Sequence, residues 1–95
     1  MPHKNYIKKA AVKFIEQNSV WFKDFSNWYV GITADPDTRY SAHGSPSIWR
    51  AWKADHPDHA RQLEKFFIDL GFKGAPGGGT RTYYVYVYKH SGPLT

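Results

Sequence analysis

Three side chains suited to phosphate chemistry occur close together in the stretch NWYVGITADPDTRYSAHG, residues 27–44. Tyr29 lies in an alternating segment, and Arg39 and His43 follow a turn at Asp-Pro. An arginine guanidinium grips phosphate oxygens bidentately, and a histidine can relay a proton near neutral pH. Because His43 stands four residues after Arg39, the two share one face of a helix. The spacing predicts a site around the turn; the plain alternative is a sheet tyrosine beside a solvated helix face.

A strand and a short helix are expected to position these residues. Residues 28–33 alternate between an apolar face and a second face that carries Tyr29. The apolar face consists of Trp28, Val30 and Ile32. Asp35 can cap a helix that starts at Pro36 and runs to about residue 43, where Gly44 can end it.

Periodicity predicts four further elements: a helix over residues 5–17, a strand over 47–53, a helix from about 55 to 70 and a strand over 82–89. Asp55 with Asp58 resembles a capping box, and Gly71 ends that helix. The apolar residues of the two helices are Tyr6, Ile7, Ala10, Ala11, Phe14 and Ile15, then Ala60, Leu63, Phe67 and Leu70. The last strand has Tyr84, Tyr86 and Tyr88 on one face. The order α–β–α–β–α–β predicts an α+β fold in which helices flank a small three-stranded, mostly antiparallel sheet.

Composition points to one domain over residues 1–95 and to an anionic partner. The formal net charge is +5, which favours nucleic acid. A basic face of the first helix would contact phosphates through Lys4, Lys8, Lys9 and Lys13. The chain has no cysteine, so disulfides and thiolate metal sites are excluded. No apolar run is long enough to span a bilayer and no signal peptide is evident, so a cytoplasmic protein is expected.

Four positions in order resemble the GIY-YIG nuclease family. Tyr29-Val30-Gly31 with Arg39 eight residues after the glycine looks like the second half of the family motif. His43 stands where a histidine or tyrosine commonly follows, and Glu64 in ARQLEKFF stands where the family places its metal-binding glutamate. The resemblance implies a small endonuclease that cleaves DNA with Mg²⁺ or Mn²⁺. Tyr29 would position or deprotonate the attacking water, and one carboxylate suffices because Mg²⁺ keeps several waters.

The sequence also departs from the family pattern. The first half of the motif, a G-I-Y strand before Tyr29, is missing, and so is an asparagine beyond the glutamate helix. A degenerate module that binds nucleic acid or a protein partner without cutting therefore stays open. Alternatively, residues 82–89 replace the lost strand in a permuted sheet, pair with residues 28–33, and supply Tyr84 or Tyr86 to the site. The tyrosines would otherwise form an exposed or core-covering aromatic face.

Overall fold

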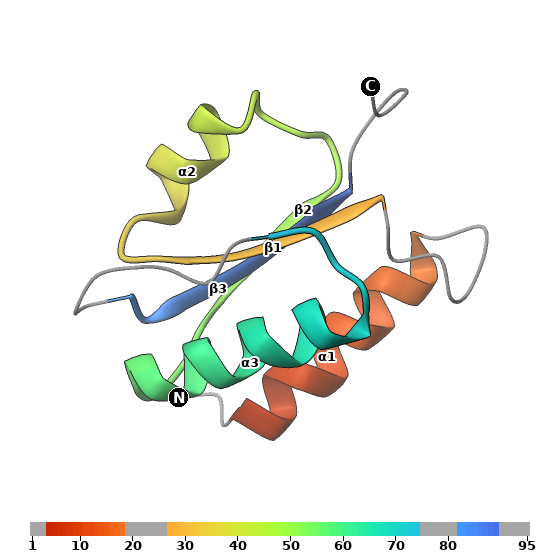
Figure 1. Cartoon of the computed structure of the whole chain (residues 1–95). Coiled ribbons are helices and arrows are strands. Elements are labelled where there is room, and N and C mark those ends of the chain that lie inside the picture. The colour runs from red at the N-terminus through yellow and green to blue at the C-terminus, as the bar shows by residue number, and fades with distance from the viewer. Residues whose placement is uncertain (1–3, 19–26, 75–81, 90–95) are drawn as a thin grey trace.

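The computed structural model describes residues 4–18, 27–74 and 82–89, which form three helices and a three-stranded sheet (Figure 1). The elements in chain order are α1 (Lys4–Gln17), β1 (Trp28–Thr33), α2 (Pro36–Ala42), β2 (Trp49–Lys53), α3 (Pro57–Leu70) and β3 (Tyr84–Lys89). The predicted α+β class and element order are confirmed. None of the three helices combines the length and apolar character required to cross a membrane.

The sheet is antiparallel throughout, and the last strand lies in its centre. β3 pairs with β1, which sets Tyr88 opposite Tyr29 and Tyr86 opposite Gly31. β3 also pairs with β2, which sets Tyr88 opposite Trp49. Directly opposed residues share a face of an antiparallel sheet, so the predicted pairing of residues 82–89 with 28–33 is confirmed, with Tyr84, Tyr86 and Tyr88 on the face of Tyr29.

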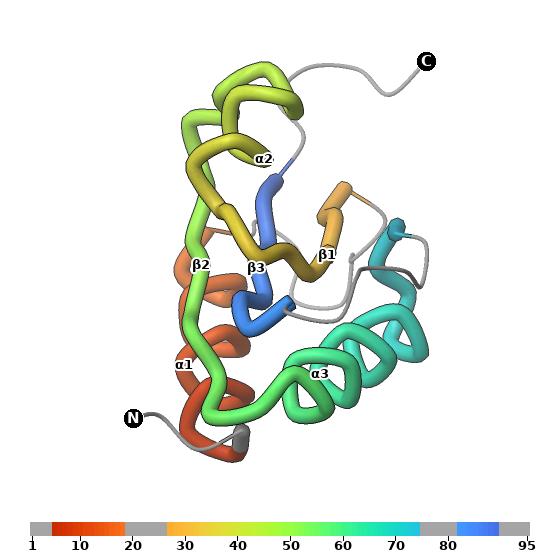
Figure 2. The backbone as a smooth tube through the Cα atoms, turned by 90° about the vertical axis from the view of Figure 1, so that its left-hand side faces the viewer, coloured from red at the N-terminus to blue at the C-terminus, as the bar shows by residue number. Residues whose placement is uncertain are grey.

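The two faces of the sheet have different covers. α1 and α3 pack beneath it, α1 on the β2 side and α3 on the β1 side, while α2 lies above it (Figures 1 and 2). The core beneath the sheet is built mainly from Ile7, Ala11, Ile15, Trp28, Val30, Leu63, Phe67, Val85 and Val87. Two residues predicted for the apolar stripes are instead exposed: Tyr6 by 62% and Leu70 by 43%. Both lie outside the arcs of their helices that meet the sheet, so the stripes are narrower than expected.

The residue that caps the N-terminus of α2 is the predicted one, whereas the N-cap residue of α3 differs from the prediction. Asp35 caps α2 through its carboxylate, which accepts hydrogen bonds from the backbone N–H and the hydroxyl of Thr38. The expected Asp55–Asp58 box does not form; His56 caps α3 instead, and its Nδ1 accepts from the Asp58 N–H at 3.1 Å. Gly71 ends α3 in the left-handed region, with φ 116°.

Smaller differences concern boundaries and the outer edge of β1. β2 begins at Trp49 rather than near residue 47, and α2 ends at Ala42, so His43 is its C-cap residue. The outer edge of β1 is paired locally with Lys73, whose N–H and C=O bond the backbone at both sides of Tyr29. The segment GAPGGG, residues 74–79, reads as a turn or loop in the sequence, and all of it except Gly74 lies outside the described residues.

Candidate active site

A layer of aromatic rings stands on the sheet face beneath α2. We call Tyr29, His43, Trp49, Tyr86 and Tyr88 the aromatic cluster. Its rings stack across all three strands: the centroids of Tyr29 and Tyr88 are 5.2 Å apart, and those of Trp49 and Tyr86 are 4.6 Å apart. The His43 ring enters from the end of α2, with its centroid 5.1 Å from that of Tyr29. The alternation along the strands therefore places four aromatic residues on one surface, namely Tyr29, Trp49, Tyr86 and Tyr88.

His43 is held by two tyrosine hydroxyls of the central strand. Its Nε2 is 2.9 Å from the Tyr86 hydroxyl, and its Nδ1 is 3.0 Å from the Tyr88 hydroxyl. A neutral imidazole has one N–H donor and one acceptor nitrogen, so one hydroxyl donates to the ring and the other accepts from it. This arrangement fixes the orientation of the imidazole and ties the end of α2 to β3.

Gly31 makes room for Tyr86. A Cβ at position 31 would lie 2.8 Å from the Tyr86 Cε2 and closer still to the Cζ and the hydroxyl. The tyrosine ring thus lies across the backbone of β1, where only a residue without a side chain fits. The close contact with the Tyr86 ring therefore explains why a glycine stands at position 31.

Burial keeps the Tyr86 phenol protonated. Tyr86 is 4% exposed, and this desolvation is the main reason why its pKa rises to about 12. The neighbouring Tyr29 raises the pKa further, the Arg39 charge opposes the increase, and Tyr88 and Glu64 add smaller increases. Burial and Tyr29 also raise the pKa of Tyr88. At neutral pH the hydroxyl of Tyr86 is a hydrogen-bonding group and not a phenolate.

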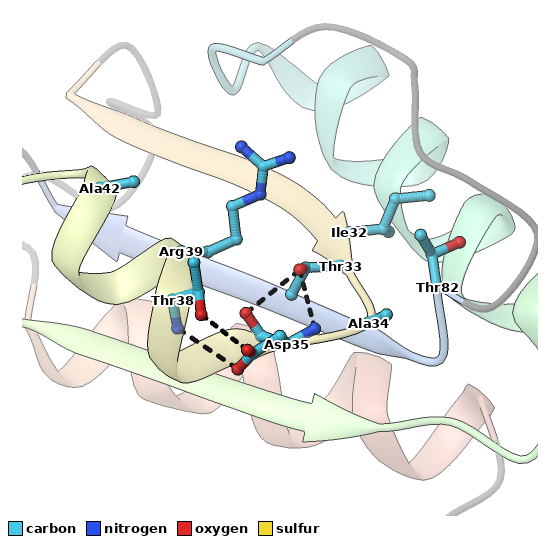
Figure 3. A pocket seen from close by; sticks show the side chains of 8 residues that line it. All are labelled: Ile32, Thr33, Ala34, Asp35, Thr38, Arg39, Ala42 and Thr82. Carbon is cyan, nitrogen blue, oxygen red and sulfur yellow. Dashed lines mark hydrogen bonds between the residues drawn. The ribbon is translucent and has the colours of Figure 1, made fainter.

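Tyr29 and Arg39 offer the polar groups that remain open at this surface. The Tyr29 side chain is half-buried and the Arg39 side chain is exposed, and neither side chain makes a hydrogen bond or ion pair within residues 4–18, 27–74 and 82–89. Arg39 reaches from α2 over β1 along an open pocket of about 370 Å³ (Figure 3). The pocket is lined by Ile32, Thr33, Ala34, Asp35, Thr38, Arg39, Ala42 and Thr82.

The Asp35 carboxylate in this pocket is occupied with capping α2. Hydrogen bonds from the hydroxyl and the backbone N–H of Thr38 hold the pKa of its carboxyl below the ordinary value. The Thr33 hydroxyl bonds both the N–H and the C=O of Asp35 and so fixes the turn between β1 and α2. The turn positions the helix, and the helix positions Arg39 and His43.

Glu64 lies in α3, below the sheet, and is only 4% exposed. Its charge is nevertheless among the influences that raise the pKa of Tyr86, so the two groups lie within electrostatic range. No group of three or more His, Asp or Glu side chains gathers in the part of the chain that the structure describes. Mg²⁺ usually takes one or two protein carboxylates, together with waters and substrate oxygens.

The remaining predicted residues are placed apart from the aromatic cluster. Tyr84 is on the same face but opposes Thr33 at the far end of β1, so Tyr86 is the tyrosine that meets His43. Lys9 and Lys13 are exposed on α1, beneath the sheet, and the Lys8 ammonium lies 4.4 Å from the centroid of the Phe66 ring. The side chain of Lys4 is outside the described residues.

Two members of the cluster were not predicted as site residues, namely Tyr88 and Trp49. The alternation of the last strand places Tyr88 beside Tyr86 on one face, which was a usable signal. Trp49 becomes visible only from the register of β2 against β3, because periodicity within one strand does not fix its partner.

Comparisons of the chain with protein-family models, with curated proteins and with solved structures found no match.

Proposed function

We propose that this protein is a small nuclease that hydrolyses DNA phosphodiester bonds, with a permuted GIY-YIG-like sheet in which β3 replaces the missing first strand. The observation that carries the proposal is the meeting of Tyr29, His43 and Tyr86 on one sheet face, with the Arg39 charge acting on the Tyr86 hydroxyl. The proposal keeps the cytoplasmic location expected from the sequence.

Arg39 binds the scissile phosphate in this proposal. Its exposed guanidinium has no counter-charge among the described residues, and its planar fork matches two phosphate oxygens. Negative charge grows on those oxygens as the attacking water adds to phosphorus. A guanidinium held beside them therefore stabilises the transition state more than the bound substrate.

Tyr29 and the His43–Tyr86 pair handle the proton of the attacking water. The Tyr29 hydroxyl, which has no hydrogen bond to other described groups, orients the water. With Nδ1 of His43 protonated, its Nε2 accepts from Tyr86. The Tyr86 hydroxyl can then pass its proton to the imidazole while it takes one from the water. No phenolate accumulates in such a relay, which is consistent with a Tyr86 pKa of about 12.

Glu64 would hold a Mg²⁺ or Mn²⁺ ion. Such an ion supplies positive charge that stabilises the developing negative charge on the phosphate. A carboxylate supplies the oxygen ligand that these ions prefer.

Cleavage of supercoiled plasmid and of a single-stranded oligonucleotide, with Mg²⁺ or Mn²⁺, tests the proposal. Arg39→Ala is expected to reduce the rate by about 10²–10³-fold because one transition-state charge contact is lost. Glu64→Gln is expected to abolish both activity and its metal dependence. Arg61→Ala, which removes an exposed arginine from α3, serves as the control and should cut at the wild-type rate.

Undiminished cleavage by purified Glu64→Gln would exclude the metal assignment, and equal activity of Arg39→Ala and wild type would exclude the phosphate assignment. A second candidate is a module with the same fold that binds nucleic acid without cutting. The saturation of both His43 nitrogens by tyrosine hydroxyls favours it, because such a histidine also has a purely structural role. Binding without any cleavage by the wild-type protein would establish this second function.

A further inference from the structure

A second pocket lies on the opposite side of the sheet, between α1 and the edge strand β2. One stripe of α1 faces alternate residues of β2 and encloses about 180 Å³. We call this the Arg50 pocket, and its lining consists of Ala10, Lys13, Phe14, Gln17, Arg50 and Trp52. It shares no residue with the aromatic cluster or with the pocket beside Arg39.

The Arg50 pocket holds two cations and no acid. Lys13 and Arg50 are exposed, and neither side chain forms an ion pair or hydrogen bond within the described part of the chain. Gln17 adds an amide donor one helical turn from Lys13. Positive charges without a protein counter-charge, beside an amide N–H, fit a phosphate oxyanion.

Aromatic walls hold the guanidinium in place. The Arg50 Cζ lies 6.0 Å from the ring centroid of Phe14 and 6.0 Å from that of Trp52. These two rings also pack edge to face, with centroids 6.2 Å apart. A guanidinium set against packed rings loses less freedom on binding than a lysine on a bare surface. The pocket is therefore better organised for phosphate than the scattered lysines of α1.

We propose that the Arg50 pocket binds a backbone phosphate of the same nucleic-acid strand that contacts Arg39 and the aromatic cluster on the other face of the sheet. The inference rests on the proposed function only in taking a nucleic acid as the ligand. β2 is an outer strand of the sheet, and successive residues of a strand point to opposite faces. Trp49 accordingly joins the aromatic cluster while Arg50 faces the pocket. A strand that passes around the β2 edge contacts both surfaces.

If the nucleic-acid strand passes around the β2 edge, the basic helix α1 beneath the sheet and the aromatic cluster above it bind the same strand. α1 lies on the β2 side of the molecule (Figure 2), so Lys13 is the lysine of the predicted basic face that reaches the edge strand. A single strand is flexible enough to bend around such an edge, and phosphate contacts position the strand without reading its sequence.

Binding of fluorescein-labelled dT20 in EDTA, measured by anisotropy at several salt concentrations, tests this site apart from cleavage. Lys13→Gln with Arg50→Gln is expected to weaken binding about tenfold and to reduce the slope of log K against log salt by about one. The matched control is Arg61→Gln with Lys65→Gln, which removes the same charge from exposed ion pairs of α3. It should weaken binding less than threefold.

Equal losses in the two double variants would overturn the proposal, because net charge alone would then account for them. Titration with inorganic phosphate and with ATP distinguishes the other sources of phosphate. Micromolar ATP or phosphate binding that is lost in Lys13→Gln/Arg50→Gln, with unchanged dT20 affinity, would show a free-nucleotide or phosphate site and overturn the strand contact. A protein that binds dT20 through this pocket but leaves plasmid intact would retain the inference and lose the nuclease proposal.

Discussion

At the scale of single residues, the site depends on a phenol that stays protonated. Tyr86 hydrogen-bonds His43, and its pKa of about 12 arises mainly from burial beneath the cluster. Even an exposed tyrosine, with a pKa of about 10, is protonated at neutral pH, and the burial of Tyr86 moves it further from a phenolate. Tyr86 orients the imidazole of His43, and in the proposed mechanism it also conducts the proton of the attacking water. In the proposed mechanism Tyr29, which is less buried and whose hydroxyl makes no hydrogen bond within the described residues, is the tyrosine that meets the substrate.

The raised pKa of Tyr86 predicts how the fold responds to alkali. A phenol pKa above its unfolded value of about 10 means that the folded state retains the proton longer. The resulting stabilisation is complete below pH 10 and is lost as pH rises from 10 through 12. Urea unfolding across pH 9–12 should therefore show a steeper loss for wild type than for Tyr86→Phe. Tyr84→Phe, on the same face but outside the cluster, should follow wild type; a Tyr86→Phe curve parallel to wild type would contradict the prediction.

At the scale of elements, the short helix α2 is held by few contacts. It has no buried residue, and its links to the sheet include the hydrogen bonds and ring contacts of its C-cap residue His43 and the Tyr40 ring, whose centroid is 5.3 Å from that of Trp49. Its position therefore depends on where the aromatic rings of the sheet stand. The ring of Tyr86 in turn depends on the missing side chain at Gly31.

Gly31→Ala is expected to displace Tyr86 and loosen α2. The added Cβ would overlap the tyrosine ring, and forced repacking of this kind costs about 1–3 kcal/mol. Gly44→Ala is the comparison: its Cβ meets nothing within 4 Å, but φ is 81°, so only backbone strain of about 1 kcal/mol is expected. Urea unfolding measures both losses, and the NMR signals of His43 report the hydrogen bond to Tyr86. An unchanged His43 environment in Gly31→Ala would refute this reasoning.

At the scale of the whole molecule, a net charge of +5 predicts salt-dependent binding to DNA. If the four lysines of α1 make four phosphate contacts, affinity should fall about fiftyfold for a single strand and about 150-fold for a duplex between 50 and 200 mM salt. Anisotropy with duplex and single-stranded oligonucleotides measures the fall. A DNA affinity that does not change with salt concentration, or no DNA binding at low salt, would favour an interaction domain whose partner is a protein.

Much of this architecture could be predicted because each element has a local cause. Alternation identified β1 and β3, the Asp35-Pro36 pair started α2, and Gly71 ended α3. The sequence could not show which arc of each helix meets the sheet, so Tyr6 and Leu70 were misplaced. It also could not show that the Tyr86 ring crosses Gly31 and that Trp49 stacks beside it, because both depend on register between strands far apart in the chain.

The central position of β3 has a consequence for how the chain folds during synthesis. β1 and β2 do not pair with each other, and the only described strand that either pairs with is β3, which follows every other described element. A ribosome-bound chain that ends before residue 84 has no sheet to assemble, so the fold forms only after Tyr84–Lys89 has emerged. Trp28 pairs with Lys89, which is far away in the chain, and contacts between such distant residues slow folding. Nascent chains arrested before this strand should be protease-sensitive, and those arrested well beyond it protected.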